Sequence, residues 1–378
     1  MAIFSYADFG SSFPQVWPEV VGQTQRKAPA LRILSEVGRL KAGTTGDMMR
    51  WIARFSGQSA AAVNADGGAF VTAAADVRQP ASLAYGSYSA PVQVTDAMRR
   101  LGSPSAGIPS QFNAYGMAAS QNIKEACEAL VKLIEQDLFA GLGTSNALTG
   151  MGTAITASGT YAAINSGTYT SWVSTVSGNS GVLRSLTINL MKAHLRTIAA
   201  ASGQGRPDLA FCTPAVFDAV ENLFDAYTQI QTTPQGGLVV PGSNPERVTK
   251  NPAVINLLGG QIKSDGFRAL RWESGGVTFV ECPDCTDPAA TNPSNTIFFV
   301  NSGDIECNFP MPSGDDGQYS APVQTVQAIE QGIGPLANLP FEMLARGRTK
   351  LAYEWDVTAW FGMRLKSRNA HGKLQDVQ

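Results

Sequence analysis

The chain has 378 residues, enough for roughly two to three domains or subdomains. Only 15% of the residues are charged and the formal net charge is −2, so the chain lacks the positive excess with which proteins bind nucleic acid in bulk. The usual charged share is about 25%. Here Gly, Ala, Ser and Thr fill the gap, and a surface of this kind is compatible with extensive contacts between subunits.

Nothing in the sequence indicates insertion into a membrane or export. No apolar run approaches the length of about 20 residues that a membrane helix needs. Residues 1–5 lack the positive and apolar regions of a secretion signal, so we expect no signal peptide. Five cysteines, an odd number, then predict reduced thiols in a cytosolic setting.

Residues 1–46 are predicted to form an N-terminal arm. Residues 1–28 carry proline and aromatic residues with few periodic signals. Pro29 then begins a short helical pattern that ends near Gly43, because proline is favoured at the first position of a helix. The apolar side of this pattern consists of Leu31, Leu34 and Val37.

Residues 47–98 are predicted to form a long β-hairpin that extends from the body of the protein. Residues 47–55 alternate, with Met49, Trp51, Ala53 and Phe55 on one face. Residues 81–95 are interpreted as the returning strand, and residues 57–75 as a tip rich in Gly, Ala and Asp. A lone hairpin is marginal in water, so this one must lie on another surface, for which a neighbouring subunit is one option. Its positive edge would consist of Arg50, Arg54 and Arg78.

Residues 110–142 are predicted to form one long helix, with Ser110 as its N-cap and Gly141 and Gly143 as its end. At about 1.5 Å per residue, a helix of roughly 30 residues would span about 45 Å. Its apolar stripe consists of Ile123, Cys127, Leu130, Ile134 and Leu138. Its charged residues lie off that stripe: Lys124, Glu125, Glu128, Lys132 and Glu135.

Residues 185–330 have the pattern of a compact α/β unit, after a low-charge stretch at 143–180. The pattern predicts a helix that starts near Ser185, a strand at 209–211 and a second helix that starts at Pro214. It also predicts a hairpin built on 270–272 and 277–280, and a buried strand at 297–300.

The most regular feature of the chain is its C-terminal strand. From Leu351 to Leu365 every odd position is apolar, while the even positions include Glu354, Asp356 and Arg364. Strict alternation predicts a strand with one buried and one wet face. Most strands have about 5–6 residues. A strand this long therefore favours an extended, plate-like molecule in which the long helix covers the apolar face.

Several motifs could carry chemistry, and each is better explained as structural. Cys282-Pro-Asp-Cys285 has the spacing of a zinc knuckle, but no second pair completes four ligands, so we expect a loop with two free thiols. His194 and His371 lack a surrounding catalytic motif and are interpreted as surface or flanking residues. Residues 141–144 follow a helix, which fits a C-cap and excludes a P-loop. Residues 313–317 are interpreted as a polar turn without calcium-loop spacing.

The C-terminal region is locally basic, and two interpretations remain open. One is contact with nucleic acid or an acidic neighbour; the other is a solvated strand face. Apart from Trp360, no aromatic residue on the polar face would stack on bases. The basic residues are Arg346, Arg348, Lys350, Arg364, Lys366, Arg368 and Lys373.

The order of these elements, together with the residue pattern of four segments, resembles that of the major capsid protein of tailed bacteriophages. This family has the Hong Kong 97-type fold, an α+β fold that encapsulin shells share. The resemblance covers nearly the whole chain, although the family has no short diagnostic motif. The segments that carry it are residues 25–31, 51–55, 92–97 and 207–214.

The resemblance implies an organisation of the chain. An N-terminal arm (1–46) would precede an extended loop (47–98) that lies across a neighbouring subunit. A peripheral domain would comprise residues 99–184, with the helix at 110–142 as its spine, and the C-terminal strands at 331–378. An axial domain (185–330) would meet its copies at the centre of hexamers and pentamers.

The resemblance also implies a function without an enzyme activity or cofactor. Copies would assemble in the host bacterial cytoplasm into an icosahedral shell, the virion head, around double-stranded DNA that is not bound sequence-specifically. The implied partners are a scaffolding protein, a portal and a decoration protein. Candidate residues for contacts between subunits are Arg50, Trp51, Arg54, Arg78, Tyr85, Tyr88, Glu125, Glu128, Lys132 and Glu135.

Three alternatives stay open at this point. An encapsulin-type compartment has the same fold and differs in its cargo. A hydrolase built on residues 185–330 would require a convergent polar constellation, which the sequence does not provide. A phage tail protein or adhesin would favour repeats and a β pattern throughout, which this chain lacks.

Overall fold

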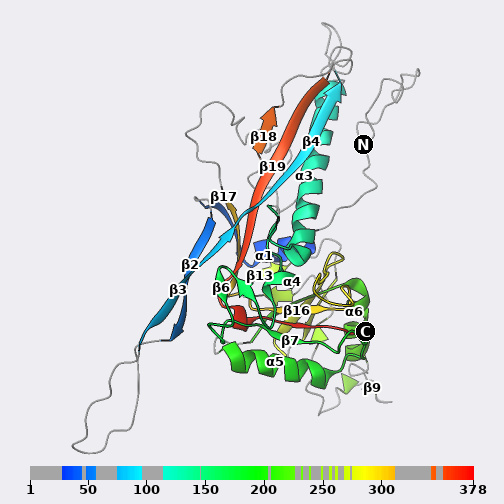
Figure 1. Cartoon of the computed structure of the whole chain (residues 1–378). Helices are drawn as coiled ribbons and strands as arrows, with labels where there is room; N and C mark the ends of the chain where they lie inside the picture. Colours follow the sequence, from blue (N-terminus) through cyan, green and yellow to red (C-terminus); the bar gives the residue numbers. More distant parts are fainter. Residues whose placement is uncertain are drawn as a thin grey trace, which may run out of the picture.

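The computed structural model contains an elongated part and a compact part (Figure 1). Within the residues that it describes, none of the helices has the length and apolar character required to cross a membrane. The structure describes residues 28–44, 48–56, 75–95, 114–144, 146–202, 206–225, 231–232, 238–239, 248–249, 255–257, 260–262, 268–272, 275–310, 342–345 and 352–378.

The elongated part is a two-stranded ribbon with a long helix beside it (Figure 1). Strand β19 (Ala352–Leu365) pairs in antiparallel register with β4 (Gly86–Thr95), from Ala352 opposite Thr95 to Phe361 opposite Gly86. Helix α3 (Ala114–Ala140) has 27 residues, which corresponds to about 40 Å. The predicted long strand and long helix are therefore confirmed, although the expected N-cap at Ser110 lies outside the described residues.

Three further strands complete the long sheet. Strand β1 (Leu40–Thr44) runs parallel to β17 (Ile305–Pro310), which pairs in turn with β19. Strand β18 (Glu342–Ala345) pairs with the middle of β19. Helix α1 (Pro29–Glu36) precedes β1 and confirms the predicted start at Pro29, but it ends well before Gly43.

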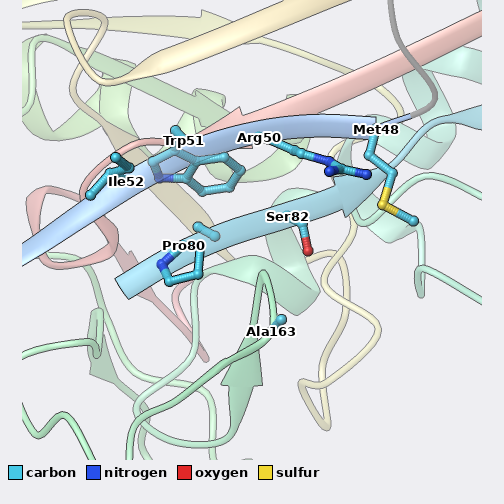
Figure 2. A pocket seen from close by; sticks show the side chains of 8 residues that line it. Met48, Arg50, Trp51, Ile52, Pro80, Ser82 and Ala163 are labelled. Carbon is cyan, nitrogen blue, oxygen red and sulfur yellow. The ribbon is translucent and has the colours of Figure 1, made fainter. Parts of the chain in front are cut away.

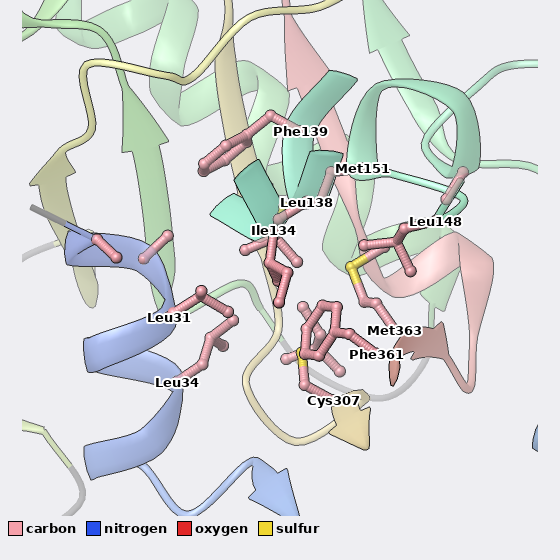
Figure 3. Close-up of a cluster of buried hydrophobic side chains, with 14 of the residues drawn as sticks. Leu31, Leu34, Ile134, Leu138, Phe139, Leu148, Met151, Cys307, Phe361 and Met363 are labelled. Carbon is pink, nitrogen blue, oxygen red and sulfur yellow. The ribbon is translucent and has the colours of Figure 1, made fainter. Parts of the chain in front are cut away.

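The core of this part lies where α1, α3 and the sheet meet (Figure 3). The alternation in β19 places Phe361, Met363 and Leu365 in the interior, while Arg364 and Trp360 remain on the other face. Figure 3 shows that side chains from α1 and α3 converge with those of β17 and β19. The labelled members, all fully or almost fully buried, are Leu31, Leu34, Ile134, Leu138, Phe139, Leu148, Met151, Cys307, Phe361 and Met363.

The predicted hairpin is present, but its returning strand is not the one expected. Strand β2 (Met48–Ser56) pairs with β3 (Val77–Ala84), with Trp51 opposite Ala81. The expected continuous strand over 81–95 is wrong, because the chain changes partner at Tyr85: β3 pairs with β2 and β4 with β19. Glycine is required just after this change, since a Cβ on Gly86 would lie 2.9 Å from the backbone nitrogen of Leu148. Residues 57–74 of the tip lie outside the described residues.

The compact part is built on a seven-stranded sheet with the order β11-β14-β15-β8-β16-β20-β7. It confirms the predicted strand at 209–211, the hairpin at 270–280 and the strand at 297–300. The strands are β11 (Val248–Thr249), β14 (Ala269–Trp272), β15 (Val277–Glu281), β8 (Leu209–Cys212), β16 (Ile297–Val300), β20 (Gly372–Leu374) and β7 (Thr175–Ser177).

Two predicted helices cover one face of this sheet, and the end of α3 covers the other. Helices α5 (Ile188–Ser202) and α6 (Pro214–Asp225) share a core with Ala210 and Cys212 of β8. The alternate residue Phe211 points the other way and packs on Phe139 of α3, with ring centroids 5.7 Å apart. The compact and elongated parts are therefore joined through a common hydrophobic core.

The sheet pairings divide the chain differently from the expected boundaries. Strands β7 and β20 lie in the seven-stranded sheet although they come from outside residues 185–330, and β17 belongs to the long sheet although it comes from inside that range. Strands of three residues have too short a pattern to be recognised in a sequence. The remaining elements are α4 (Met151–Ala154), β5 (Thr160–Tyr161), β6 (Ile164–Asn165), β9 (Gln231–Thr232), β10 (Leu238–Val239), β12 (Ile255–Leu257), β13 (Gly260–Ile262) and the 3-10 helix η5 (Arg368–Ala370).

Candidate subunit-contact surface

The two faces of strand β2 have opposite environments, as its alternation predicts. Met49 and Ala53 are buried, and Phe55 stacks on Tyr169 with ring centroids 4.3 Å apart. On the other face, the side chain of Ile52 is 67% exposed and that of Met48 is 41% exposed. Met48 and Ile52 lie on the same face of the strand, and apolar side chains that form a contiguous exposed patch are typical of a contact site for another molecule.

An open concavity of about 500 Å³ lies on this exposed side (Figure 2). Figure 2 shows side chains from β2 next to Pro80 and Ser82 of β3, with Ala163 from the neighbouring loop. That loop is attached to the hairpin, because the N–H of Ser82 donates to the carbonyl of Ala162 at 3.1 Å. The lining is mostly apolar and suits an apolar segment of a partner. It consists of Met48, Arg50, Trp51, Ile52, Pro80, Ala81, Ser82 and Ala163.

The positive edge predicted for the hairpin lies next to this concavity. Arg54 and Arg78 both contact Asp76, at 3.0 and 2.6 Å, and the side chains of both arginines remain more than half exposed. The hydrogen bond from Arg78 is the main reason that the pKa of Asp76 is below its ordinary value. Two guanidinium groups around one carboxylate leave a net positive charge on this edge of the hairpin.

The base of the hairpin is attached to the long sheet through Arg364. Its Nη1 donates to the carbonyl of Arg50 at 3.3 Å, and its guanidinium lies 5.7 Å from the centroid of the Trp51 ring. Its Nη2 lies 3.0 Å from Oε2 of Glu306, which also pairs with Lys41 at 3.2 Å and Lys366 at 3.0 Å. Three cations therefore share one nearly buried carboxylate beneath the hairpin. Burial opposes the ionisation of Glu306, but these hydrogen bonds outweigh it and lower its pKa to about 2.

Replacing Glu306 with glutamine is expected to lower the free energy of unfolding at neutral pH by roughly 2 kcal/mol, because three cations lose their shared counter-ion. Since the folded-state pKa lies below the ordinary 4.5, the stabilisation is present above pH 4.5 and is lost as the pH falls through about 2. Denaturant titrations of both proteins at pH 7 and pH 2.5 measure this, and the difference between them should shrink at the lower pH. An equal difference at both values would contradict an ionic origin.

The structure divides the ten residues predicted for subunit contacts into exposed and internal groups. Arg50, Arg54, Arg78 and Glu125 are exposed, and Trp51, Glu128 and Lys132 are partly buried. Tyr85, Tyr88 and Glu135 are buried within the chain, which corrects their assignment to a surface.

Tyr88 and Lys132 have partners inside the chain. The hydroxyl of Tyr88 donates to Asp137 at 2.9 Å and accepts from the N–H of Leu148 at 3.3 Å. Burial, with the nearby Asp137 carboxylate, raises the pKa of Tyr88 above its ordinary value. Lys132 forms an ion pair with Asp284. Because these partners are distant in the sequence, the residue spacing within β4 and α3 could not reveal them.

The motifs considered in the sequence have structural roles here. Cys282 and Cys285 are buried and form no disulfide, and burial raises the pKa of both thiols. The expectation that the histidines lie at the surface is wrong. Burial lowers the pKa of His194 to about 4 and that of His371 to about 3, so both are neutral at physiological pH. Gly141 follows the last residue of α3, which confirms that this segment ends a helix.

Two basic residues near the C-terminus are interior, so neither interpretation of the basic segment applies to them. Arg368 is 1% exposed, and its guanidinium donates to the carbonyls of Ala154 at 2.9 Å and Trp172 at 3.0 Å. Lys373 pairs with the buried carboxylate of Asp287 at 2.8 Å. Both side chains belong to the protein interior, which the clustering of basic residues in the sequence does not indicate. Arg346, Arg348 and Lys350 lie outside the described residues.

The described residues hold no group of three or more His, Cys, Asp or Glu side chains arranged to bind a metal ion. The surface feature that the structure does present is an apolar concavity next to a positive edge on the hairpin. Such a surface fits the binding of another protein chain.

Comparisons with known proteins identify the fold. No protein-family model and no curated protein matches the sequence. Among solved structures, the capsid asymmetric unit of cyanophage A-1(L) matches with a TM-score of 0.65 and 15% identity, over 96% of both chains. The capsid of a native GTA particle matches with a TM-score of 0.56 and 11% identity, over 100% of both chains.

An encapsulin has the same architecture. The holo-SrpI encapsulin complex from Synechococcus elongatus PCC 7942 matches with a TM-score of 0.53 and 12% identity, over 100% of this chain and 97% of that one. At such low identities, the agreement shows a common fold over nearly the full length of each chain. The chain therefore has the Hong Kong 97-type fold, the fold of tailed-phage capsid proteins and encapsulin shells.

Proposed function

We propose that this chain is the major capsid protein of a tailed bacteriophage, with a structural rather than an enzymatic role. Its copies form hexamers and pentamers that close into an icosahedral shell around packaged double-stranded DNA. The observation that carries the proposal is the fold, which this chain has in common with the capsid units of a cyanophage and a GTA particle over nearly its full length.

The exposed face of the hairpin supports assembly as the physical role. In the single chain, Ile52 and Met48 are exposed, and the concavity between β2, β3 and the loop at Ala163 is open to the surface. A neighbouring copy that covers this face removes apolar surface from water at each contact. In a shell each contact is head-to-tail, and many modest contacts act together once the rotation closes.

The proposal assigns roles to the segments. The hairpin within residues 47–98 is the extended loop that crosses a neighbouring subunit. Helix α3, β4 and β19 form the peripheral domain, and the seven-stranded sheet with α5 and α6 forms the axial domain near the centre of each capsomer. The proposed partners are a scaffolding protein, a portal and a decoration protein, with assembly in the host cytoplasm and final residence in the virion.

An encapsulin-like compartment is the second candidate, because the SrpI encapsulin has the same fold. A hydrolase on the α/β part is less well supported. Both histidines of the chain are buried and neutral, so neither is presented to a substrate as a catalytic base.

The content of purified particles tests this proposal. Particles formed by this chain in its natural host are treated with nuclease, and the protected nucleic acid and co-purifying proteins are quantified. We expect nuclease-protected double-stranded DNA of uniform length. Particles that instead enclose one abundant protein and no DNA would contradict the capsid proposal and support the encapsulin alternative.

A further inference from the structure

Helix α1 begins without an N-cap of its own. The first N–H groups of a helix have no partner within it and are usually satisfied by the side chain of the preceding residue. That residue is Ala28, which has no side-chain acceptor, and Pro29 has no N–H to offer. The N–H groups of Ala30 and Leu31 donate instead to the side chain of Glu135 on α3, more than 100 positions later in the chain.

Glu135 therefore caps α1 from another helix. Its Oε1 accepts from the N–H of Ala30 at 3.2 Å, and its Oε2 accepts from the N–H of Leu31 at 3.4 Å. The side chain has no exposed surface. A carboxylate at a helix N-terminus is favoured by the helix dipole, whereas a buried carboxylate is disfavoured by the loss of its hydration.

The charged groups around Glu135 are largely engaged with one another. On α3, Lys132 forms an ion pair with Asp284 of the loop after β15, and Gln136 donates to the same carboxylate at 3.3 Å. On α1, Arg32 and Glu36 pair at 3.2 Å. Among the described residues, the buried thiols of Cys282 and Cys285 also face Glu135.

The balance of these effects favours the neutral acid. Burial is the strongest influence and raises the pKa of Glu135. The hydrogen bonds from the N–H groups of Ala30 and Leu31 lower this pKa, the Asp284 carboxylate raises it further, and the Lys132 ammonium lowers it. The result is a pKa of about 8, compared with an ordinary value of 4.5. The side chain therefore changes its protonation state within the range in which proteins are normally handled.

We propose that Glu135 is a proton-controlled latch that holds α1 on α3. The neutral carboxyl keeps α1 docked, with Leu31 and Leu34 in the core. As the pH rises above 4.5, a carboxyl released by detachment of α1 ionises in water, so detachment becomes progressively more favourable up to about pH 8. Because the folded-state pKa is raised, the stabilisation is complete below pH 4.5 and is lost as the pH rises through 8.

Hydrogen exchange of α1 across a pH series tests the latch. Full-length protein is labelled between pH 6 and pH 9, its oligomeric state is checked at each pH, and protection is corrected for the intrinsic exchange rate. Opening lets the carboxyl ionise at its ordinary pKa, so the protection of residues 28–37 should fall by roughly 10- to 100-fold over this range. Protection of β8 and β16 should stay constant. Unchanged protection of α1, or an equal fall in β8 and β16, would overturn the proposal without any variant.

Two variants separate Glu135 from other titrating groups. Glu135→Gln cannot ionise and should keep α1 protected equally at pH 6 and pH 9. Glu125→Gln, at an exposed position of the same helix, should retain the pH dependence of the unmodified chain. The same fall in protection in Glu135→Gln as in the unmodified chain would show that another group drives the opening and would overturn the latch. None of these outcomes depends on the chain being a capsid protein.

Discussion

Replacing Arg368 with alanine is expected to lower the free energy of unfolding by about 4 kcal/mol or more, because two buried and two partly buried carbonyls would lose their donors together. The guanidinium donates to Ala154, Trp172, Ser158 and Gly159, and thereby fixes the segment between α4 and β7 to the C-terminal end of β19. No carboxylate among the described residues pairs with Arg368. Burial, opposed in part by Tyr161, lowers its pKa to about 10, so it still carries its charge at neutral pH.

Denaturant unfolding of the purified variant measures this effect. Arg368→Lys keeps a charge but loses the planar fork of donors, so it should be intermediate. Arg196→Ala, on the exposed side of α5, is the matched control and should change stability by no more than about 0.5 kcal/mol. If the alanine variant at position 368 stayed within about 1 kcal/mol of the unmodified chain, the guanidinium would not be an organising contact.

Replacing Ile52 with aspartate is expected to abolish assembly while leaving the isolated chain folded. Ile52 is 67% exposed, so the substitution should change the stability of a single chain by no more than about 0.5 kcal/mol. In the proposed shell, a neighbouring copy would cover the same position. Full burial of an isoleucine stabilises by about 1.5–3 kcal/mol, whereas a buried unpaired carboxylate is strongly unfavourable. Because this difference recurs at every copy, even a partial effect at one contact prevents closure.

Sedimentation velocity and thermal unfolding, measured together, distinguish assembly from folding. The aspartate variant should sediment as a small species with an unchanged unfolding transition. Ile52→Val keeps the position apolar and should assemble like the unmodified chain. Normal assembly of the aspartate variant would remove the exposed face of β2 from the proposed interface.

The elements that the sequence predicted correctly are those whose pattern repeats over many residues. The alternation of residues 351–365 and of β2, and the apolar stripe of α3, each sample one face of an element several times, so the period is unambiguous. The prediction of a single returning strand for the hairpin was wrong for a related reason. The apolar pattern continues through Tyr85 without a break, so the sequence does not show that the chain changes its pairing partner there from β2 to β19.

The interior polar residues could not be predicted from local patterns at all. Glu135, Arg368 and Lys373 have charged side chains in segments that look solvent-facing, yet each is fully buried by partners from distant segments. The candidate contact surface was predictable to the extent that it depends on alternation: the exposed face of β2 and the arginines Arg54 and Arg78 are where the sequence placed them. The tyrosines were misplaced, because Tyr88 is turned inward by its bond to Asp137.

Electron microscopy of the expressed chain, with and without the products of neighbouring genes, tests the proposed assembly most directly. We expect hexameric and pentameric rings or closed icosahedral shells, in which the hairpin of each copy lies on the next. A discrete monomer or dimer under every condition would contradict the proposal that this chain builds a shell.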